Sequence, residues 1–232
     1  QFNRKLIAQV FDFAEEMERV VAAGGSEELR GKIMGSLFYA VSTRTRLSFE
    51  AAMHRLGGSV VSTEHPDLFS DFVSSSHFED TISVVNQYAD VIVLRHTDPG
   101  MAKKAAAVSS IPVINAGGGD QHPTQALLDL FTIDEEFGGV DGIHVAIVGD
   151  ILHSRVARSN IWGLIKLGAR VTVCGPPTLI PPGIEELGAS VTYDLDEVLP
   201  SVDVLNILRI QFERQHGAYF PSIREYAVEY GI

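Results

Sequence analysis

Residues 32–56 read KIMGSLFYAVSTRTRLSFEAAMHRL, and this stretch sets the pattern for the rest of the chain. An apolar run ends at Tyr39, a short polar segment follows, and a helical pattern of apolar residues starts near Leu47. Gly57 and Gly58 then stop the helix, and a new apolar run begins at Ser59. This order of strand, polar loop and helix predicts a parallel sheet covered by helices.

The same alternation of strands and helices continues along the chain. Gly138 and Gly139 interrupt it, and it restarts at His144. We expect helices over 6–23, 42–56, 79–88, 100–107, 123–137 and 155–167 and near Ile184, with residues 62–77 polar and irregular. We expect strands over 32–39, 59–61, 91–95, 112–115, 144–149, 170–174, 189–193 and 204–208. The sequence therefore predicts an α/β fold of two doubly wound parallel-sheet domains, residues 1–138 and 139–232, with helices on both faces.

Composition and charge exclude several classes of partner. The 232-residue chain has a formal net charge of −12 and one cysteine. Nucleic acids and anionic membranes require a basic surface, so we expect neither as a partner. Cys174 lies in the apolar run 171–174, which predicts a buried strand residue rather than a catalytic thiol. The sequence contains no signal peptide and no apolar run long enough to cross a bilayer, and we expect a cytoplasmic protein.

Common nucleotide, metal and hydrolase motifs are not present in this sequence. The loop after the expected strand 144–149 lacks the glycines of a dinucleotide-binding turn, and the chain contains no P-loop. No histidine or carboxylate spacing matches a metal site, and no nucleophile-elbow motif occurs. The triple glycine at 117–119 is a weak signal that is more typical of a flexible turn.

The pentapeptide Ser-Thr-Arg-Thr-Arg at 42–46 is the first candidate site. At the first turn of a helix, it would surround one point with backbone N–H groups, hydroxyl groups and a guanidinium, where the helix dipole already favours negative charge. Phosphate fits such a site best. The same residues would also suit an ordinary N-cap, and the pentapeptide alone leaves both interpretations open.

Further anion donors follow other predicted strands, namely Arg95, the segment 122–125, Arg155 and Arg209. In open parallel sheets, ligands bind outside the carboxyl ends of the strands. Each residue has an ordinary explanation by itself, as a solvated arginine or a packed histidine. Together they predict one crevice that binds small anions.

Several ordered segments resemble the aspartate/ornithine carbamoyltransferase family. The stretch FYAVSTRTRLSFE at 38–50 is similar to the first signature of that family, and similar blocks follow in the same order at 53–58, 90–96, 122–130, 148–155 and 209–214. The pattern Arg-x-Gln-x-Glu-Arg at 209–214 resembles the block of the aspartate-specific members rather than that of the ornithine-specific ones. The resemblance covers nearly the whole chain.

This resemblance implies transfer of a carbamoyl group from carbamoyl phosphate to the amine of L-aspartate, an early step of pyrimidine synthesis, without cofactor or metal. The residues that match carbamoyl-phosphate-binding positions are Ser42, Thr43, Arg44, Thr45, Arg95, His122 and Gln125. Among them, Thr45, Arg95 and His122 would act in catalysis by donating hydrogen bonds to the carbonyl oxygen. Arg155, Arg209 and Gln211 match positions that bind aspartate.

The resemblance also implies a homotrimer with shared active sites, and it leaves room for regulatory or other pyrimidine-pathway subunits. A loop from the neighbouring subunit would contribute Ser70, whereas Ser74 stands where the family has a lysine. Ala40 replaces a glutamate that pairs with arginines matching Arg155 and Arg214. Family members also extend several dozen residues beyond the position of Ile232, including a loop that contacts the carbamoyl group.

These departures leave two other functions open. One is a catalytically silent homologue that binds carbamoyl phosphate or phosphate and acts as a scaffold or regulatory subunit, which the changes at 40 and 74 favour. The other is a carbamoyltransferase with a different amine acceptor. Retention of Arg155, Arg209 and Gln211 argues against the latter, because these side chains would suit the carboxylates of aspartate.

Overall fold

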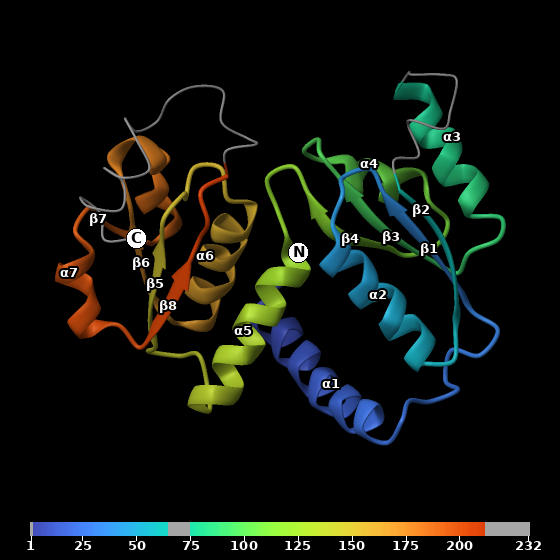
Figure 1. The fold of residues 1–232 in the computed structure, drawn as a ribbon, viewed down its shortest axis with the longest axis horizontal. Helices are drawn as coiled ribbons and strands as arrows, with labels where there is room; N and C mark the ends of the chain where they lie inside the picture. The colour runs from blue at the N-terminus through green and yellow to red at the C-terminus, as the bar shows by residue number, and fades with distance from the viewer. Residues whose placement is uncertain (1, 65–74, 212–232) are drawn as a thin grey trace. The chain divides into compact units, whose positions relative to one another are not determined.

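The computed structural model describes residues 2–64 and 75–211 and contains two compact units (Figure 1). The first unit comprises Lys5–Thr124, and the second begins at Gln125 and includes the first residues of the chain up to Arg4. The division falls within helix α5 (Pro123–Phe137). The expected domain boundary after residue 138 remains a prediction.

The first unit contains a four-stranded parallel sheet with the order β2-β1-β3-β4. Its strands are β1 (Ile33–Phe38), β2 (Ser59–Glu64), β3 (Val91–His96) and β4 (Val113–Gly118). Its helices are α1 (Arg4–Ala22), α2 (Thr43–Arg55), α3 (Ser75–Val85) and α4 (Met101–Val108). The chain reverses its direction across the sheet between β1 and β3, which is where ligands bind in open parallel sheets.

Alternate residues of the first sheet pack against helices on its two faces. Leu37 and Leu94 belong to a core with side chains of α3 and α4, including Ile82 and Ala105. On the other face, a second cluster joins Met34, Phe38 and Val93 to Met53 of α2. Because both faces are covered, β1 and β3 are apolar almost throughout, as expected for central parallel strands.

The second unit repeats this arrangement with a parallel sheet of order β7-β6-β5-β8. Its strands are β5 (His144–Val148), β6 (Arg170–Cys174), β7 (Ser190–Thr192) and β8 (Val204–Ile207). The main helix is α6 (Arg155–Leu167), followed by the short α7 (Leu195–Val198) and the 3-10 turns η1 (Pro177–Leu179), η2 (Ile184–Leu187) and η3 (Leu199–Ser201). The change of direction lies between β5 and β8.

In each sheet, an aspartate joins the starts of two neighbouring strands, β1 and β3 in the first sheet and β5 and β8 in the second. Asp90, just before β3, donates its backbone N–H to the Ile33 carbonyl at 2.8 Å and accepts the Ile33 N–H at 2.8 Å. Asp203, just before β8, makes the same pair of bonds with His144, at 2.9 and 2.8 Å. In each unit, this pair aligns the two strands whose carboxyl ends flank the change of direction.

The two doubly wound parallel sheets confirm the expected α/β fold class, and three details of the sequence-based prediction are wrong. Residues 62–64 are not irregular but complete β2, because an edge strand can pair through its backbone even where its side chains are polar and at most partly buried. The helix expected over 79–88 spans Ser75–Val85. The helix expected near Ile184 is a single 3-10 turn between Gly183 and Gly188, both with positive φ, and is too short for an α-helix.

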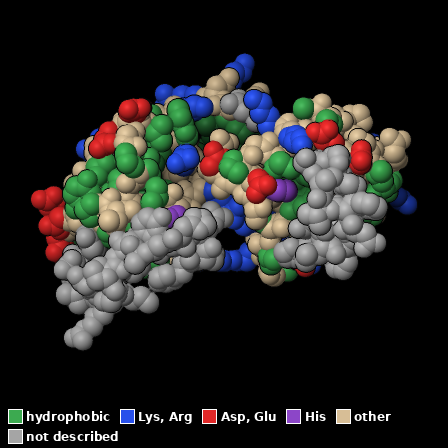
Figure 2. All heavy atoms as spheres, turned by 90° about the horizontal axis from the view of Figure 1, so that it is seen from above, with side chains coloured by type: hydrophobic (Ala, Val, Ile, Leu, Met, Phe, Trp, Pro, Cys, Tyr) green, Lys and Arg blue, Asp and Glu red, His purple; other side chains and the backbone are tan. Residues whose placement is uncertain are grey.

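Two further features of residues 2–64 and 75–211 are the distribution of surface charge and the composition of the helices. On the face drawn in Figure 2, the coloured Lys and Arg side chains are interspersed with Asp and Glu and form no continuous basic area. Among the helices that the structure describes, none combines the length and the apolar character needed to span a bilayer.

Candidate active site

The pentapeptide forms the start of α2, directly after β1. Ser42 occupies the N-cap position in an extended conformation, but its side chain makes no capping bond to the helix backbone. Its Oγ instead donates to Thr45 Oγ1 at 3.0 Å. Thr43 and Arg44 are exposed on the first turn. The hydroxyl groups thus do not satisfy the N–H groups of the first turn as a simple N-cap would, so these groups and the helix dipole remain available for an anion.

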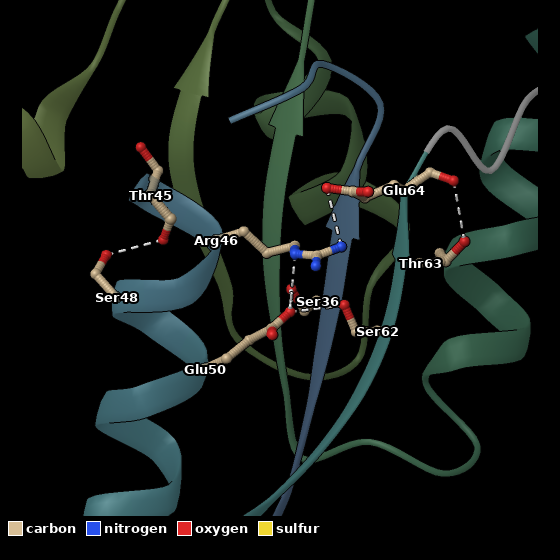
Figure 3. Close-up of polar contacts among 8 residues, drawn as sticks. All are labelled: Ser36, Thr45, Arg46, Ser48, Glu50, Ser62, Thr63 and Glu64. Atoms are coloured by element: carbon tan, nitrogen blue, oxygen red, sulfur yellow. Dashed lines mark hydrogen bonds and ion pairs between the residues drawn. The ribbon is translucent and has the colours of Figure 1, made fainter. Parts of the chain in front are cut away.

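The second arginine of the pentapeptide has a different environment from the first. Figure 3 shows Arg46 between two carboxylates, with Nη1 2.9 Å from Glu64 Oε1 and Nε 3.6 Å from Glu50 Oε1. The same Glu50 oxygen accepts hydrogen bonds from Ser36 of β1 at 2.9 Å and Ser62 of β2 at 2.6 Å. This network ties the first two turns of α2 to both strands. Arg46 is therefore a structural residue, whereas Arg44 can bind a ligand.

Arg95 and His122 form a buried pair at the carboxyl ends of β3 and β4. Their side chains are in contact, with Arg95 Nη1 3.3 Å from His122 Nε2. The same Nη1 donates to the Ala116 carbonyl at 3.1 Å. The backbone carbonyl of Arg95 accepts the N–H of Tyr39 at 2.9 Å, which fixes the loop that leads into α2. The first unit thus links the Arg95–His122 pair to the segment that carries the pentapeptide.

Gly117 makes this buried pair possible. The β3–β4 register shifts between Leu94 and His96, so that one extra residue of β4 lies opposite Arg95. Gly117 has a φ of +104°, and a Cβ there would lie 2.8 Å from Arg95 Nη1 and 2.9 Å from His122 Cδ2. Sequence reasoning treated the glycine run as a flexible turn and missed this role. The signal was present as a triple glycine immediately after an apolar strand.

The contact with Arg95 defines the tautomer of His122. A guanidinium can only donate hydrogen bonds, so His122 Nε2 is the acceptor in this arrangement. The proton of the neutral ring then lies on Nδ1, which is 3.4 Å from Thr124 Oγ1. For Nε2 to donate to a ligand oxygen, the ring must change its tautomer or take up a second proton.

The candidate aspartate-binding residues lie in the second unit, after β5 and β8. Arg155 is the first residue of α6 and is half-buried. Arg209 is exposed, with Nη1 3.4 Å from the Ile210 carbonyl. The Gln211 backbone N–H donates to Asp150 Oδ2 at 3.0 Å. These three residues therefore follow strands that pair with one another in the same sheet.

Asp150 connects the two loops that carry these residues. Its carboxylate is fully buried, and Oδ1 also accepts from the backbone N–H of His153 at 3.2 Å and lies 2.8 Å from His153 Nδ1. The loop 150–154 leads into Arg155, so Asp150 fixes it relative to the loop of Gln211. From the sequence, this loop was noted for its lack of glycines and as part of the family block 148–155, but the carboxylate was not identified.

Three further sequence-based predictions have different outcomes. Gln125 lies on the first turn of α5, three residues after His122, and donates through Nε2 to Asp129 Oδ1 at 2.8 Å. Ser70 and Ser74 lie outside the described residues.

Cys174 is buried as expected, and burial, together with the negative charge of Asp194, raises the pKa of its thiol. A raised pKa disfavours the reactive thiolate. No set of three or more His, Cys, Asp or Glu in residues 2–64 and 75–211 is arranged to hold a metal ion.

Sequence comparison defines the class of protein to which this site belongs. Residues 1–135 match the family model described as aspartate/ornithine carbamoyltransferase, carbamoyl-P binding domain. The catalytic subunit of aspartate carbamoyltransferase from Halothermothrix orenii is 50% identical over 230 residues, which are 97% of this chain and 73% of that protein. The chain belongs to the aspartate/ornithine carbamoyltransferase family.

Within that family, several aspartate transcarbamoylases of known structure are similar to this chain. The catalytic subunit of the M. jannaschii enzyme is 40% identical, with a TM-score of 0.86 over 98% of this chain and 76% of that one. The Trypanosoma cruzi enzyme in complex with carbamoyl phosphate is 36% identical, with a TM-score of 0.83 over 99% of this chain and 76% of that one. The chain is thus a homologue of aspartate carbamoyltransferase catalytic subunits and spans about three quarters of the length of these relatives.

Proposed function

We propose that this chain transfers the carbamoyl group of carbamoyl phosphate to the amine of L-aspartate, which gives N-carbamoyl-L-aspartate and phosphate. The observation that carries the proposal is that two features lie at neighbouring strand ends of the first sheet. One is the start of α2, which has no side-chain cap, and the other is the buried Arg95–His122 pair. The first feature suits a phosphate, and the second suits the carbonyl oxygen of an acyl group.

In this proposal, the start of α2 binds the phosphate. Ser42, Thr43 and Thr45 supply hydroxyl groups, the first turn supplies backbone N–H groups, and the exposed Arg44 supplies a guanidinium. Arg44 can bind two phosphate oxygens at once, as a lysine cannot. The carboxylates of Glu50 and Glu64 neutralise the neighbouring Arg46, so that binding of the anion depends on Arg44 rather than on Arg46.

The carbonyl oxygen of the carbamoyl group accepts hydrogen bonds from Thr45, Arg95 and His122. Attack by the substrate amine places negative charge on this oxygen, and donors aimed at it lower the barrier. His122 Nε2 takes part once its proton has moved from Nδ1, with the ligand oxygen replacing Nε2 as the acceptor for Arg95. The acyl phosphate is already activated, so no protein nucleophile is required. The departing phosphate accepts the proton of the amine.

Arg155, Arg209 and Gln211 bind the two carboxylates of L-aspartate in this account. Asp150 supports them because it holds the backbone of Gln211 and the loop before Arg155. Guanidinium groups suit carboxylates through paired hydrogen bonds, which favours a dicarboxylic amine acceptor over a monocarboxylic one. Gln125 belongs to the carbamoyl end of the site. The family resemblance implies a homotrimer in which Ser70 of a neighbouring subunit completes the active site, and we expect this homotrimer to be cytoplasmic.

A catalytically silent homologue is the second candidate, and the residue that favours it is Ala40. In members of the family, a glutamate at this position pairs with the arginines that match Arg155 and Arg214. Ala40 provides no carboxylate, although its backbone N–H is held by the Arg95 carbonyl at 3.3 Å. Such a protein would bind carbamoyl phosphate without turnover.

A product assay separates these functions. The purified chain is incubated with carbamoyl phosphate and either L-aspartate or L-ornithine, and carbamoylated products are quantified. We expect N-carbamoyl-L-aspartate well above the background without protein, and we expect Arg209→Ala, but not the exposed control Arg170→Ala, to require more aspartate. If no product forms while phosphate or N-(phosphonacetyl)-L-aspartic acid still raises the melting temperature, the silent homologue is correct. If neither ligand changes the melting temperature, both candidates are wrong.

A further inference from the structure

A carboxylate in the second unit is held between two side-chain amides. Asp129 of α5 accepts a hydrogen bond from Gln125 Nε2 on Oδ1 at 2.8 Å. Its other oxygen, Oδ2, accepts from Asn160 Nδ2 of α6 at 2.7 Å. One end of this chain of contacts is thus a candidate ligand-binding residue, and the other end lies in the interior of the unit.

The chemistry of the carboxylate determines which way both amides are oriented. The nitrogen and oxygen of an amide group are usually difficult to distinguish, but an ionised carboxylate only accepts hydrogen bonds. The Gln125 atom beside Asp129 must therefore be Nε2. Because the two atoms branch from the same carbon, Oε1 is directed away from Asp129.

The partner on α6 shows that this arrangement is more than an ordinary helix-surface pair. Spaced four residues apart, Gln125 and Asp129 could form the weak contact common on helices. However, Asn160 is only 1% exposed, and its Oδ1 accepts no hydrogen bond from any residue that the structure describes. The buried amide thus keeps its NH2 group on Asp129 while its own carbonyl oxygen lacks a donor. This fixes the carboxylate from the side opposite Gln125.

Close packing of the two helices leaves little freedom for this contact to rearrange. A Cβ at Gly163 of α6 would lie 2.5 Å from Leu130 Cδ1 of α5, so the two helices pack closely here and a larger residue would have to displace the Leu130 side chain. Leu130 is the neighbour of Asp129 in the chain, and Gly163 lies one turn after Asn160. This close packing keeps the helix segments that carry Asp129 and Asn160 next to each other.

We propose that Asp129 is a positioning residue that orients Gln125 so that its Oε1 acts as an acceptor for an N–H donor of the ligand. Such an acceptor selects the NH2 group of carbamoyl phosphate over acyl phosphates without an N–H group, such as acetyl phosphate. The inference rests on the proposed function, which assigns Gln125 to the carbamoyl end of the site. Neither the family resemblance nor the sequence patterns had assigned a role to Asp129.

The orientation can be tested without any ligand. In the 15N-labelled protein, the side-chain NH2 signals of Gln125 are identified by their loss in Gln125→Met. The two amides donate to different oxygens of Asp129, and an asparagine has an oxygen in only one of these two positions, so one of the two hydrogen bonds is lost. We therefore expect Asp129→Asn to shift the Gln125 or Asn160 NH2 signals, and Glu136→Gln, an exposed charge change on the same helix, to leave them in place. Unchanged signals in Asp129→Asn would refute the orientation.

The effect on selectivity is tested by measuring the affinities for carbamoyl phosphate and acetyl phosphate. We expect Asp129→Asn to weaken binding of carbamoyl phosphate roughly tenfold, the usual worth of one hydrogen bond, while binding of acetyl phosphate hardly changes. In the Gln125→Met background, Asp129→Asn should have no further effect, because Asp129 acts through Gln125. Asn160→Ala provides a second variant, in which we expect a smaller loss in the same direction.

The outcomes separate this inference from the proposed function. Equal losses for both acyl phosphates, or the same loss with and without Gln125, would mean that Asp129 only stabilises the fold, and the inference would be wrong. A wild-type protein that binds no carbamoyl phosphate would overturn the proposed function and the selectivity together. The NH2 signals would still decide whether Asp129 orients Gln125.

Discussion

The starts of α2 and α6 look alike in sequence but differ in structure. Each helix follows the first strand of its sheet, and each has a serine at the N-cap position. Ser154 caps α6 in the ordinary way, because its Oγ accepts the backbone N–H of Ala157 at 3.1 Å. The side chain of Ser42 donates instead to Thr45 Oγ1 and makes no bond to the backbone of α2. The first helix start is thus open to an anion, and the second is closed by its own side chain.

The candidate ligand-binding arginines of the two units differ in a similar way. Arg95 is buried and held by Ala116 and His122, whereas Arg209 is exposed beyond the end of its strand. A buried donor with a fixed direction is suited to stabilising charge in a transition state, because little reorganisation is needed. An exposed arginine on a loop is suited to binding a substrate from solution. The comparison predicts that the first unit carries the chemistry and the second selects the amine.

The largest effect should follow from loss of the buried guanidinium. We expect Arg95→Met to reduce kcat roughly 10²- to 10³-fold, the loss typical for one donor to a developing oxyanion. Arg30→Met, which removes an exposed arginine of the same unit, should leave kcat unchanged. Steady-state kinetics at saturating carbamoyl phosphate test this difference. A kcat within twofold of wild type would show that Arg95 has no part in the transition state.

A methyl group at Gly117 should disturb the same pair without removing either side chain. We expect Gly117→Ala to lower activity by more than tenfold, because its Cβ would meet Arg95 and His122 within 3 Å. Gly24→Ala is the matched control, since Gly24 has a similar φ of +98° and a Cβ there meets nothing within 4 Å. Both variants should lose about 1 kcal/mol of unfolding free energy from backbone strain. If the two variants have equal activity, Gly117 matters only for its backbone conformation.

The two N-cap serines provide the sharpest test of the comparison between the helices. Ser154→Ala should lower the free energy of unfolding by about 1 kcal/mol, because it removes a capping hydrogen bond. Ser42→Ala should cost less stability but should weaken the rise in melting temperature caused by phosphate. Denaturant unfolding and thermal melts with and without phosphate measure both quantities. If Ser154→Ala instead weakened the effect of phosphate and Ser42→Ala cost more stability, the anion site would lie at the start of α6 rather than at that of α2.

A smaller effect concerns acid stability in the first unit. The backbone N–H of Ile33, and then Lys32, lower the pKa of Asp90 below its ordinary value of 3.8. A lowered pKa means that the folded state favours the carboxylate, so this contribution is complete above pH 3.8 and is lost as the pH falls through the folded-state pKa. Asp90→Asn should therefore weaken the dependence of unfolding on pH in this range. An unchanged acid transition would contradict the role of Asp90 at the strand starts.

Local patterns in the sequence were sufficient to predict most of the fold. Apolar runs ending in Gly or polar residues predicted the central strands, because parallel strands covered on both faces are apolar along their length. Pro123 correctly predicted the start of α5. The edge strand β2 was predicted too short, since Ser62 to Glu64 are polar and only their pairing with β1 makes them a strand.

The site was less predictable where it depends on contacts between distant residues. The resemblance named Arg95, His122 and Gln125, but not the residues that orient them. Gly117 leaves room for the side chains of Arg95 and His122 to meet at the ends of two strands. Asp129 is held by the buried amide of Asn160 on the next helix. No local pattern encodes such contacts. Likewise, the difference between Ser42 and Ser154 depends on the direction of one hydroxyl group.

Titration of carbamoyl phosphate into the wild-type protein and Arg44→Ala, followed by calorimetry, tests most directly whether the open start of α2 is the anion site. Arg44 is exposed, so its replacement should not disturb the fold, and Arg55→Ala on the last turn of the same helix provides the control. We predict saturable binding to the wild type and to Arg55→Ala, and a loss of at least about tenfold in affinity for Arg44→Ala, as expected for one charged hydrogen-bond donor. Equal affinities for all three proteins would show that carbamoyl phosphate binds elsewhere.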